Sequence, residues 1–584
     1  MIIQNRIALA GFPLLFLLFC CSTGFAQTDV NPSGSDLSQP AKLIAGELRR
    51  SGTIDLPISC KPELKEEFET ATALLHSFFY DEARRRFQSI AERDGKCAMA
   101  YWGIAMTWYH PLWGPPTKEE RKLGKAAALH AKGLDIGSEL ERGLIDAIVT
   151  FYMTDELLPI GSAAGKQKAG TVLAGCICCG PQAHGARAIA FRDKLEKLRT
   201  KFPDNVEVTT FYALSLLGTA LPTDQTHEQQ KRAADILLPL FKVNANHPGI
   251  AHYIIHAYDY PDLAKRGLFA ARKYGDIAPW VPHALHMPSH IYTRLGMWSD
   301  SIESNRASSI AARDHAARHY GGRAIMDDLH AMDYLAFAYL QTAQDSKALS
   351  VLDELKRIEA IEPGNGFASA YAAAAIPARY VLERRDWTAA AKLELPLASF
   401  VGEFPMAVAH IQFARAVGAA RLGDLDSAAN AVARLAELRD KLKDSPFSWW
   451  SGQVEIQKLA SEGWLAYAQG KASIAEKLLR RAAELEDSIG THPVTPGQIL
   501  PVHEQLGDLM LELGKPKTAL VEYERSLVSF PRRFLSHEGA AKAAELAGDL
   551  KKSQLHYRAL LTMAGDSKER PAVTTAARAA LDRQ

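Results

Sequence analysis

The sequence lacks the short motifs that mark the common enzyme classes. It contains no glycine-rich phosphate loop and no GxSxG nucleophile elbow. The HxxxH pairs at 252–256 and 286–290 enclose Tyr-Ile-Ile and Met-Pro-Ser. Neither pair therefore contains the glutamate that acts as the base in HExxH zinc peptidases. No motif indicates a nucleotide-driven, serine-dependent or zinc-peptidase reaction.

The chain also lacks an excess of charge and has few long apolar runs. Its 68 basic and 67 acidic residues give a formal net charge of +1. This balance does not favour a nucleic acid or an anionic membrane surface as the partner. Beyond the apolar run 7–21, no stretch is long enough to cross a bilayer. We therefore expect no nucleic-acid partner and no integral membrane segment after removal of the N-terminus.

The N-terminus has the pattern of a targeting segment. Arg6 precedes the apolar run, and Gly24-Phe25-Ala26 supplies small residues at a cleavage position. The pattern predicts a signal peptide at 1–26 and a mature chain that begins at Gln27. An uncleaved anchor is the alternative, although the run is short for a membrane span. We expect an exported protein, periplasmic or extracellular.

Cysteine is scarce, and five of the seven cysteines follow the predicted cleavage position. Cys60 and Cys97 are 37 residues apart, each just before a predicted helix. This spacing predicts a disulfide between neighbouring hairpins, worth about 4 kcal/mol in the chain-entropy model. Cys176, Cys178 and Cys179 lie in a loop rich in glycine and alanine. They form either a flexible thiol cluster or a soft-metal or redox site.

A repeated helical pattern is the main feature of the rest of the chain. In the segment 500–533, small residues occupy the eighth, fifteenth and twentieth places, and an aromatic occupies the twenty-fourth. These residues are Gly507, Gly514, Ala519 and Tyr523, followed by Ser526 and Pro531. The pattern resembles the tetratricopeptide repeat (TPR), a 34-residue helical hairpin. The resemblance implies that the small residues let two helices touch and that the proline ends the second helix.

The same template fits most of the chain. Further units begin near 64, 98, 248, 282, 329, 371, 409, 456 and 534, with less regular hairpins at 117–243. We predict an all-α superhelix, a TPR-like solenoid of about twelve hairpins with a concave groove lined by the first helix of each pair. The expected segments are a disordered linker at 27–59, irregular hairpins at 60–247, histidine-rich units at 248–355 and C-terminal units at 356–584.

Histidines recur at fixed places in the histidine-rich units. Nine of the nineteen fall between 247 and 330. His252 and His256 share one face of a helix, and His286 and His290 repeat that spacing 34 residues later. The resemblance to TPR units implies that these places face the groove. The candidate groove residues are His252, His256, His286, His290, Tyr292, Arg294, His330 and Asp333.

Histidines four residues apart can bind one metal ion from a single helix turn. The hypothesis is a site of His252, His256, His286 and His290 for zinc, copper, nickel or iron, with Asp333 shifting the preference toward iron or manganese. A further expectation is that Asp259 orients an imidazole as a hydrogen-bond partner. A kink at Pro288 would tilt His286 relative to His290. Two alternatives remain open. The histidines either form structural hydrogen bonds along the stack, or bind an anionic or peptide ligand with help from Arg294 and Tyr292.

Two peptides, 252–259 and 283–291, also resemble a group of exported bacterial repeat proteins; this supports the fold and implies no chemistry. The sequence thus favours an exported solenoid that binds a ligand, peptide or protein partner in a histidine-lined groove, with or without a transition metal. One alternative is a metal-dependent enzyme that takes its base from Asp259 or Asp333. The other is an assembly scaffold whose binding residues are Glu504, Asp508 and Glu538.

Overall fold

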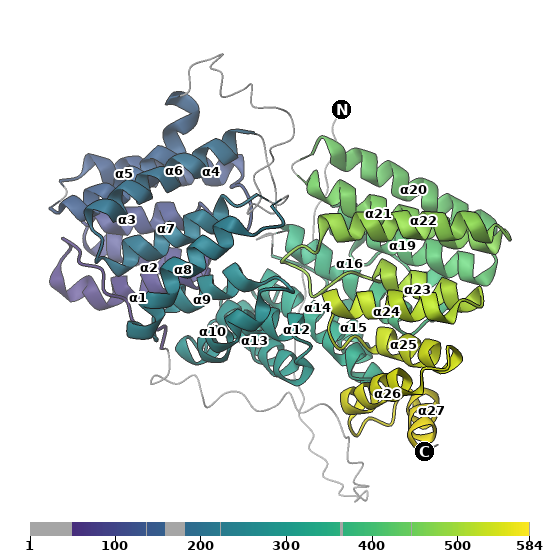
Figure 1. Ribbon diagram of the computed structural model, residues 1–584. Coiled ribbons are helices and arrows are strands. Elements are labelled where there is room, and N and C mark those ends of the chain that lie inside the picture. Colours follow the sequence, from purple (N-terminus) through teal and green to yellow (C-terminus); the bar gives the residue numbers. More distant parts are fainter. Residues whose placement is uncertain are drawn as a thin grey trace, which may run out of the picture. The chain divides into compact units, whose positions relative to one another are not determined.

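The computed structural model describes residues 50–135, 137–157, 182–221, 224–362, 366–445 and 447–582 (Figure 1). All of them belong to one compact unit, 44–584. The predicted signal peptide, most of the 27–59 linker and the cluster of Cys176, Cys178 and Cys179 lie outside the described residues. The described part consists of helices with one isolated β-bridge between Ala324 and Ile361. The predicted all-α fold of TPR-like hairpins is confirmed.

The N-terminal hairpins are formed by helices that each pack against the next one along the chain. They are η1 (Pro62–Leu64), α1 (Lys65–His76), α2 (Tyr80–Arg93), α3 (Ala98–Thr107), α4 (Lys118–Gly133), α5 (Glu139–Leu157), α6 (Gln182–Lys201), α7 (Val206–Gly218) and α8 (Glu228–Val243). The helices α4, α5, α6 and α8 are longer than those of the first hairpin. The buried apolar residues of this part form one continuous cluster from Ile54 to Tyr292.

The histidine-rich units follow. They are α9 (Pro248–Tyr258), α10 (Ala264–Ile277), α11 (Pro282–His286), α12 (Pro288–Arg294), α13 (Trp298–His319), α14 (Met326–Gln341) and α15 (Asp345–Lys356). At the expected kink, α11 ends at His286 and α12 starts at Pro288, while Met287 between them keeps a helical backbone conformation. Proline has no N–H to continue the ladder. The turn is held by the Met287 N–H, which donates to the His283 carbonyl at 2.9 Å.

The C-terminal units contain the most regular repeats. Their helices are α16 (Gly366–Glu383), α17 (Trp387–Ala391), α18 (Ala398–Val401), α19 (Pro405–Leu422), α20 (Leu425–Lys443), α21 (Trp449–Ala468), α22 (Ala472–Ile489), α23 (Val502–Glu512), α24 (Pro516–Ser529), α25 (Phe534–Leu546), α26 (Leu550–Ala564) and α27 (Pro571–Asp582). At Gly507 an added Cβ would lie 2.8 Å from the Tyr523 ring. The small residue at the eighth place therefore allows α23 and α24 to touch.

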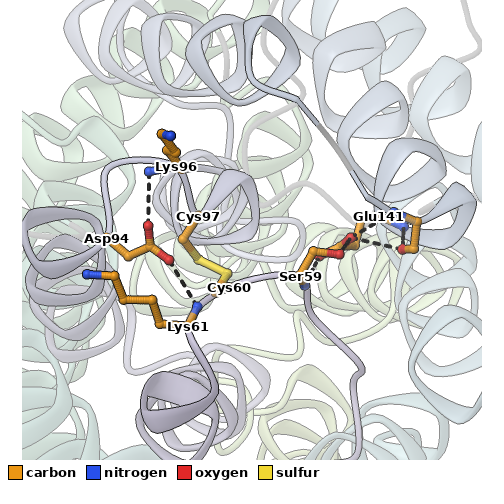
Figure 2. The surroundings of a disulfide bond; sticks show 8 residues. Ser59, Cys60, Lys61, Asp94, Lys96, Cys97 and Glu141 are labelled. Carbon is orange, nitrogen blue, oxygen red and sulfur yellow. Dashed lines mark hydrogen bonds between the residues drawn. A yellow bond between two sulfur atoms is a disulfide. The ribbon is translucent and has the colours of Figure 1, made fainter.

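The disulfide between Cys60 and Cys97 is present, with the two Cα atoms 4.7 Å apart (Figure 2). It joins the start of the first hairpin to the N-terminus of α3. Beside it, the Asp94 carboxylate accepts from the backbone N–H of Lys61 at 3.0 Å and of Lys96 at 3.2 Å. The disulfide therefore closes a loop whose ends the Asp94 side chain also joins by hydrogen bonds.

The chain is packed before the first helix, from 50 to 59, where the linker was expected to be disordered. Ile54 and Leu56 are buried, and the Thr53 N–H donates to the Asn246 carbonyl at 2.9 Å. Burial of these two apolar side chains offsets the entropy lost by ordering the segment. Within the described part of the chain, no helix combines the length and apolar character needed to cross a membrane.

Candidate metal centre

A first group of three histidines is formed by two consecutive hairpins. His252 and His256 lie one turn apart on α9, and His283 comes from α11. The Nε2 atom of His252 lies 3.0 Å from that of His256 and 3.1 Å from that of His283. One ligand atom from each residue falls within 4.8 Å of the others. We call this group the first triad.

A second triad is formed in the same way one repeat later. It consists of His286 on α11, His290 on α12 and His330 on α14. The Nε2 atoms of His286 and His290 are 2.9 Å apart. The ring of His330 lies 4.2 Å from that of His286 and 5.8 Å from that of His290, centroid to centroid. The four predicted metal ligands are thus divided between two sites, and each site gains a third histidine.

The far side of the triad rings is fixed by acceptors. The Nδ1 atom of His252 lies 2.7 Å from the backbone carbonyl oxygen of His76. The Nδ1 atom of His290 lies 2.7 Å from a carboxylate oxygen of Asp259. Carbonyl and carboxylate oxygens only accept, so Nδ1 carries the hydrogen and donates in both rings. The prediction that Asp259 orients an imidazole agrees with this contact, and His290 is the residue it holds.

His286 is oriented by an amide. Its Nδ1 lies 2.6 Å from Oδ1 of Asn305. The Asn305 Nδ2 group donates to the Ser301 carbonyl at 2.7 Å, and this assigns Oδ1 to the side that faces His286. Nδ1 of His286 is therefore also the donor, as in His252 and His290.

These tautomers leave a lone pair on the Nε2 atoms of His252, His286 and His290, which face the middle of a triad. In the second triad, the lone pairs of His286 and His290 point at each other across 2.9 Å. Two acceptors at this distance repel unless a proton or a metal ion lies between them. Donation from Nδ1 to an acceptor is the usual arrangement of a metal-ligating histidine.

Protonation of the rings is disfavoured by their surroundings. Burial, reinforced by the neighbouring histidines, lowers the pKa of His252, His283 and His286 well below its usual value. The same causes lower the pKa of His256 and His330 to about 3. At neutral pH these imidazoles are neutral, which is the form that binds metal.

Asp259 keeps its charge although it is buried. Burial alone would raise its pKa, but Arg294 and His290 outweigh that effect and hold the pKa below its usual value. The Arg294 Nε atom donates to the second carboxylate oxygen at 3.0 Å. The carboxylate is thus a fixed acceptor for the imidazole of His290.

Local sequence explains how α9 reaches its position. Pro248 occupies the first turn, where its missing N–H is not needed, and the His247 side chain accepts from the Ile250 N–H at 3.3 Å. Gly249 lies against the His76 ring, which an added Cβ would approach to 2.5 Å. Only glycine therefore lets α9 pack this closely on the end of α1, whose last carbonyl holds His252.

Aromatic rings pack on both triads. Phe78 packs on the first triad, with its ring centroid 4.4 Å from that of His252. It has a left-handed backbone with φ of 55°, a strained conformation for a bulky residue. Tyr334 packs on the second triad, 4.8 Å from the His286 ring. Both rings shield the histidines from water.

A cavity of about 550 Å³ lies against the triads. Two histidines of each triad line it, while His252 and His286 lie behind them. The remaining wall is largely apolar and aromatic, and includes Leu112, Trp113, Tyr260, Trp449 and Phe530. Acidic residues also line it: Asp224, Asp259, Asp262, Glu486 and Asp487. The volume is typical of cavities that hold small molecules.

The connection 490–501, between α22 and α23, forms one wall of this cavity. Two buried arginines hold its backbone. Arg294 donates to the carbonyls of Thr495 and Pro496, both at 3.2 Å. Arg379, on α16, donates to two further carbonyls of the same connection at 2.7 Å. The sequence prediction did not include this segment, although its glycine and prolines interrupt the repeat pattern.

Three of the predicted groove residues have other roles. Arg294 reaches the cavity wall, but its guanidinium group is bound to Asp259 and the 490–501 backbone. Tyr292 is not among the cavity-lining residues, because it follows His290 by two positions and points to another face of α12. Asp333 is buried in an ion pair with Arg379 at 3.1 Å and does not join either triad.

A separate group of buried histidines surrounds Glu207, on α7. One carboxylate oxygen accepts from His76 Nε2 at 2.8 Å and the other from His247 Nε2 at 2.9 Å. Burial alone would raise the pKa of Glu207, but His247 and His76 lower it far below its usual value. The other nitrogen of His76 contacts the Tyr253 hydroxyl at 2.9 Å. Sequence reasoning missed Glu207 because it lies in the irregular hairpins.

The C-terminal carboxylates proposed for a scaffold role have partners within the chain. Glu504 accepts from Arg533 at 2.7 Å, and both side chains are buried. Asp508 binds Arg385 at 3.0 Å, and Glu538 binds Lys542. These charges stabilise the C-terminal units and are not presented to a partner as free groups.

Comparison with known proteins adds only general similarity. No protein-family model matches the chain, and no curated protein matches it. A TPR protein from Parabacteroides merdae overlaps 51% of this chain and 98% of its own, at 13% identity and a TM-score of 0.28. Yeast Tom70 overlaps 89% and 96%, at 10% identity and a TM-score of 0.32. The APC/C complex Cut9–Hcn1 overlaps 88% and 96%, at 10% identity and a TM-score of 0.25. These values are low, so no role of the matched proteins is transferred to this chain.

Proposed function

We propose that this TPR-like solenoid binds a transition-metal ion in each histidine triad and a small ligand in the adjoining cavity. The observation that carries the proposal is the pair of Nε2 atoms of His286 and His290, 2.9 Å apart with both Nδ1 atoms committed to acceptors. Structural histidines normally place a donor opposite an acceptor. Facing lone pairs are the arrangement that a bound cation satisfies.

The ligand belongs to the proposal because each triad supplies only three protein atoms. Three protein ligands and an open position are typical of metal sites that bind an exogenous molecule. The open positions would face the cavity, since His256 and His283 of one triad and His290 and His330 of the other line it.

Elemental analysis of protein purified without an affinity tag tests this proposal. We expect up to two equivalents of transition metal per chain, both in wild-type protein as purified and in wild-type protein loaded with excess metal. The double variant His256→Leu/His290→Leu should retain its helical circular dichroism and lose both equivalents. His130→Gln changes an exposed residue on α4 and is the matched control. A wild-type protein that takes up none of zinc, copper, nickel, iron or manganese would refute the proposal.

We also propose that the mature protein is exported. The Cys60–Cys97 disulfide supports this, because such bonds persist in oxidising compartments. N-terminal sequencing of the protein from the natural host should give a chain that begins at Gln27. A chain that keeps residues 1–26 and remains in the cytoplasm would contradict export.

A further inference from the structure

The two triads are copies of one arrangement. His252 and His286 are the inner members, and His256 and His290 follow them one turn later toward the cavity. The ring centroids of His252 and His256 are 4.7 Å apart. Those of His286 and His290 are 4.8 Å apart. The third member, His283 or His330, comes in both cases from the first helix of the next hairpin. Two consecutive repeats have therefore built the same three-nitrogen site.

The copies adjoin each other. The rings of His256 and His290, which are equivalent in the two triads, are 6.4 Å apart. The rings of His283 and His286 are 6.2 Å apart. Neighbouring helix axes are usually 8–10 Å apart, so the histidines meet on the inner side of the stack. The distance between the rings of His256 and His290, in different triads, thus equals the 6.4 Å between the rings of His256 and His283 within the first triad.

We propose that the two triads form a single dinuclear copper centre, whose two ions hold one small bridging ligand supplied from the cavity. This inference rests on the proposed metal binding. It adds the identity of the metal, the joining of two ions in one centre and the class of ligand that bridges them. Imidazole nitrogens hold a metal at about 2 Å, so two ions bound to these adjoining triads would lie within reach of one anion of two or three atoms.

The donor set favours copper. Both triads offer only imidazole nitrogen, whereas iron sites of the facial type include a carboxylate, and manganese, magnesium and calcium prefer oxygen. Asp259 is committed to Arg294 and His290, and Asp333 to Arg379. For a given nitrogen site, copper binds more tightly than zinc, nickel or iron.

The charge of the site also favours copper, and it explains why an anion would bridge the two ions. Six neutral imidazoles supply no negative charge, and two divalent ions in this buried site would repel each other strongly. Copper can bind as a monovalent ion, which halves the charge to be accommodated. In the divalent state an anion between the ions offsets the repulsion. The four cavity-lining histidines place the open coordination positions on the side from which such an anion arrives.

The first measurement is the copper stoichiometry of each triad. Full-length protein titrated with Cu(I) under anaerobic conditions should bind two equivalents. His256→Leu, in the first triad, and His290→Leu, in the second, should each bind one, and the exposed control His130→Gln should bind two. His283→Leu and His330→Leu provide a second variant of each triad in case one of the first pair does not fold. If the wild type binds zinc but not copper, the copper assignment fails while metal binding stands.

The second measurement tests coupling between the ions. In Cu(II)-loaded wild type with azide added, electron paramagnetic resonance should show interacting ions, with the ordinary signal lost or split. His256→Leu and His290→Leu should give an ordinary isolated Cu(II) signal of one spin per chain under the same conditions. Two independent spins per chain in the azide-treated wild type would overturn the dinuclear centre but leave metal binding intact. Absence of any bound metal would instead overturn the proposed function itself.

Discussion

Two groups of buried histidines lie side by side in this solenoid and differ in what their ring nitrogens face. Around Glu207, each imidazole Nε2 meets a carboxylate oxygen at 2.8–2.9 Å. In the triads, Nε2 meets another Nε2 at 2.9–3.1 Å. The two groups are joined through His76, whose ring belongs to the first and whose carbonyl holds His252 of the second. The first group places each ring opposite a carboxylate, whereas the second places ring nitrogens opposite one another, as the proposed metal binding requires.

The two groups also differ in where their carboxylate lies relative to the histidine rings. Glu207 touches its histidines directly and fills the position that a metal would occupy. Asp259 lies on the outer side of His290 and leaves the inner nitrogen free. The position of the carboxylate, inside the Glu207 group and outside the second triad, is therefore the main difference between these two clusters.

The largest expected effect comes from removing the carboxylate of the Glu207 group. Glu207→Leu leaves two buried imidazoles without their charged acceptor and should lower the free energy of unfolding by about 3 kcal/mol or more. His256→Leu should change it by less than about 1 kcal/mol in metal-free protein, since His256 is partly exposed and its Nε2 faces another nitrogen. Urea unfolding of metal-free protein measures both. Equal losses in the two variants would remove the distinction between the groups.

Metal should stabilise the triads and leave the Glu207 group unaffected. Zinc at a free concentration of one hundred times its Kd adds about 2.7 kcal/mol to the free energy of unfolding for each occupied site. The increase should appear in the wild type and in His130→Gln, and vanish in His256→Leu/His290→Leu. Thermal unfolding with and without zinc provides the measurement. If zinc raises the free energy of unfolding of the double variant as much as that of the wild type, the metal binds elsewhere. The His76–Glu207–His247 group is then the next candidate.

Asp259 allows a finer test within the triads. Asp259→Asn removes the charged acceptor of His290 Nδ1 and should weaken metal binding at the second triad by about 10- to 100-fold. Chelator competition in a His256→Leu background, where only the second triad is intact, measures this change. Asp262→Asn alters an exposed acid at the cavity edge three residues away and is the matched control. An effect of equal size in the control would indicate general electrostatic attraction instead of orientation of the ring.

The fold was largely predictable because the small residues and prolines of each hairpin act locally. Gly507 against Tyr523 and the break before Pro288 are set by residues close in sequence. The same holds for the recurrence of His252 and His256 at His286 and His290. The disulfide also followed from local spacing, since Cys60 and Cys97 begin adjacent hairpins.

The completion of the site was less predictable because it depends on distant contacts. His283 and His330 occupy the same place in successive units, a signal that was available in the sequence but was not used to define two triads. The capture of Asp333 by Arg379 depends on residues 46 positions apart. The 490–501 wall, held by Arg294 across about 200 residues, has no local signature beyond its glycine and prolines. Periodicity gives the ring positions, and tertiary packing decides which atoms they face.

The smallest expected effect is the pH dependence of metal-free protein. Burial lowers the pKa of His330 to about 3, against about 6.5 in an unfolded chain. Between these values the unfolded state binds more protons, so the free energy of unfolding falls as the pH is lowered. His330→Leu should reduce this loss by about 1 kcal/mol between pH 6.5 and pH 5.5. Urea unfolding at the two pH values measures the difference, and His130→Gln should keep the wild-type slope. An unchanged slope in His330→Leu would mean that the ring is accessible to protons in the folded protein. The second triad would then lack the shielded, neutral imidazole that metal binding requires.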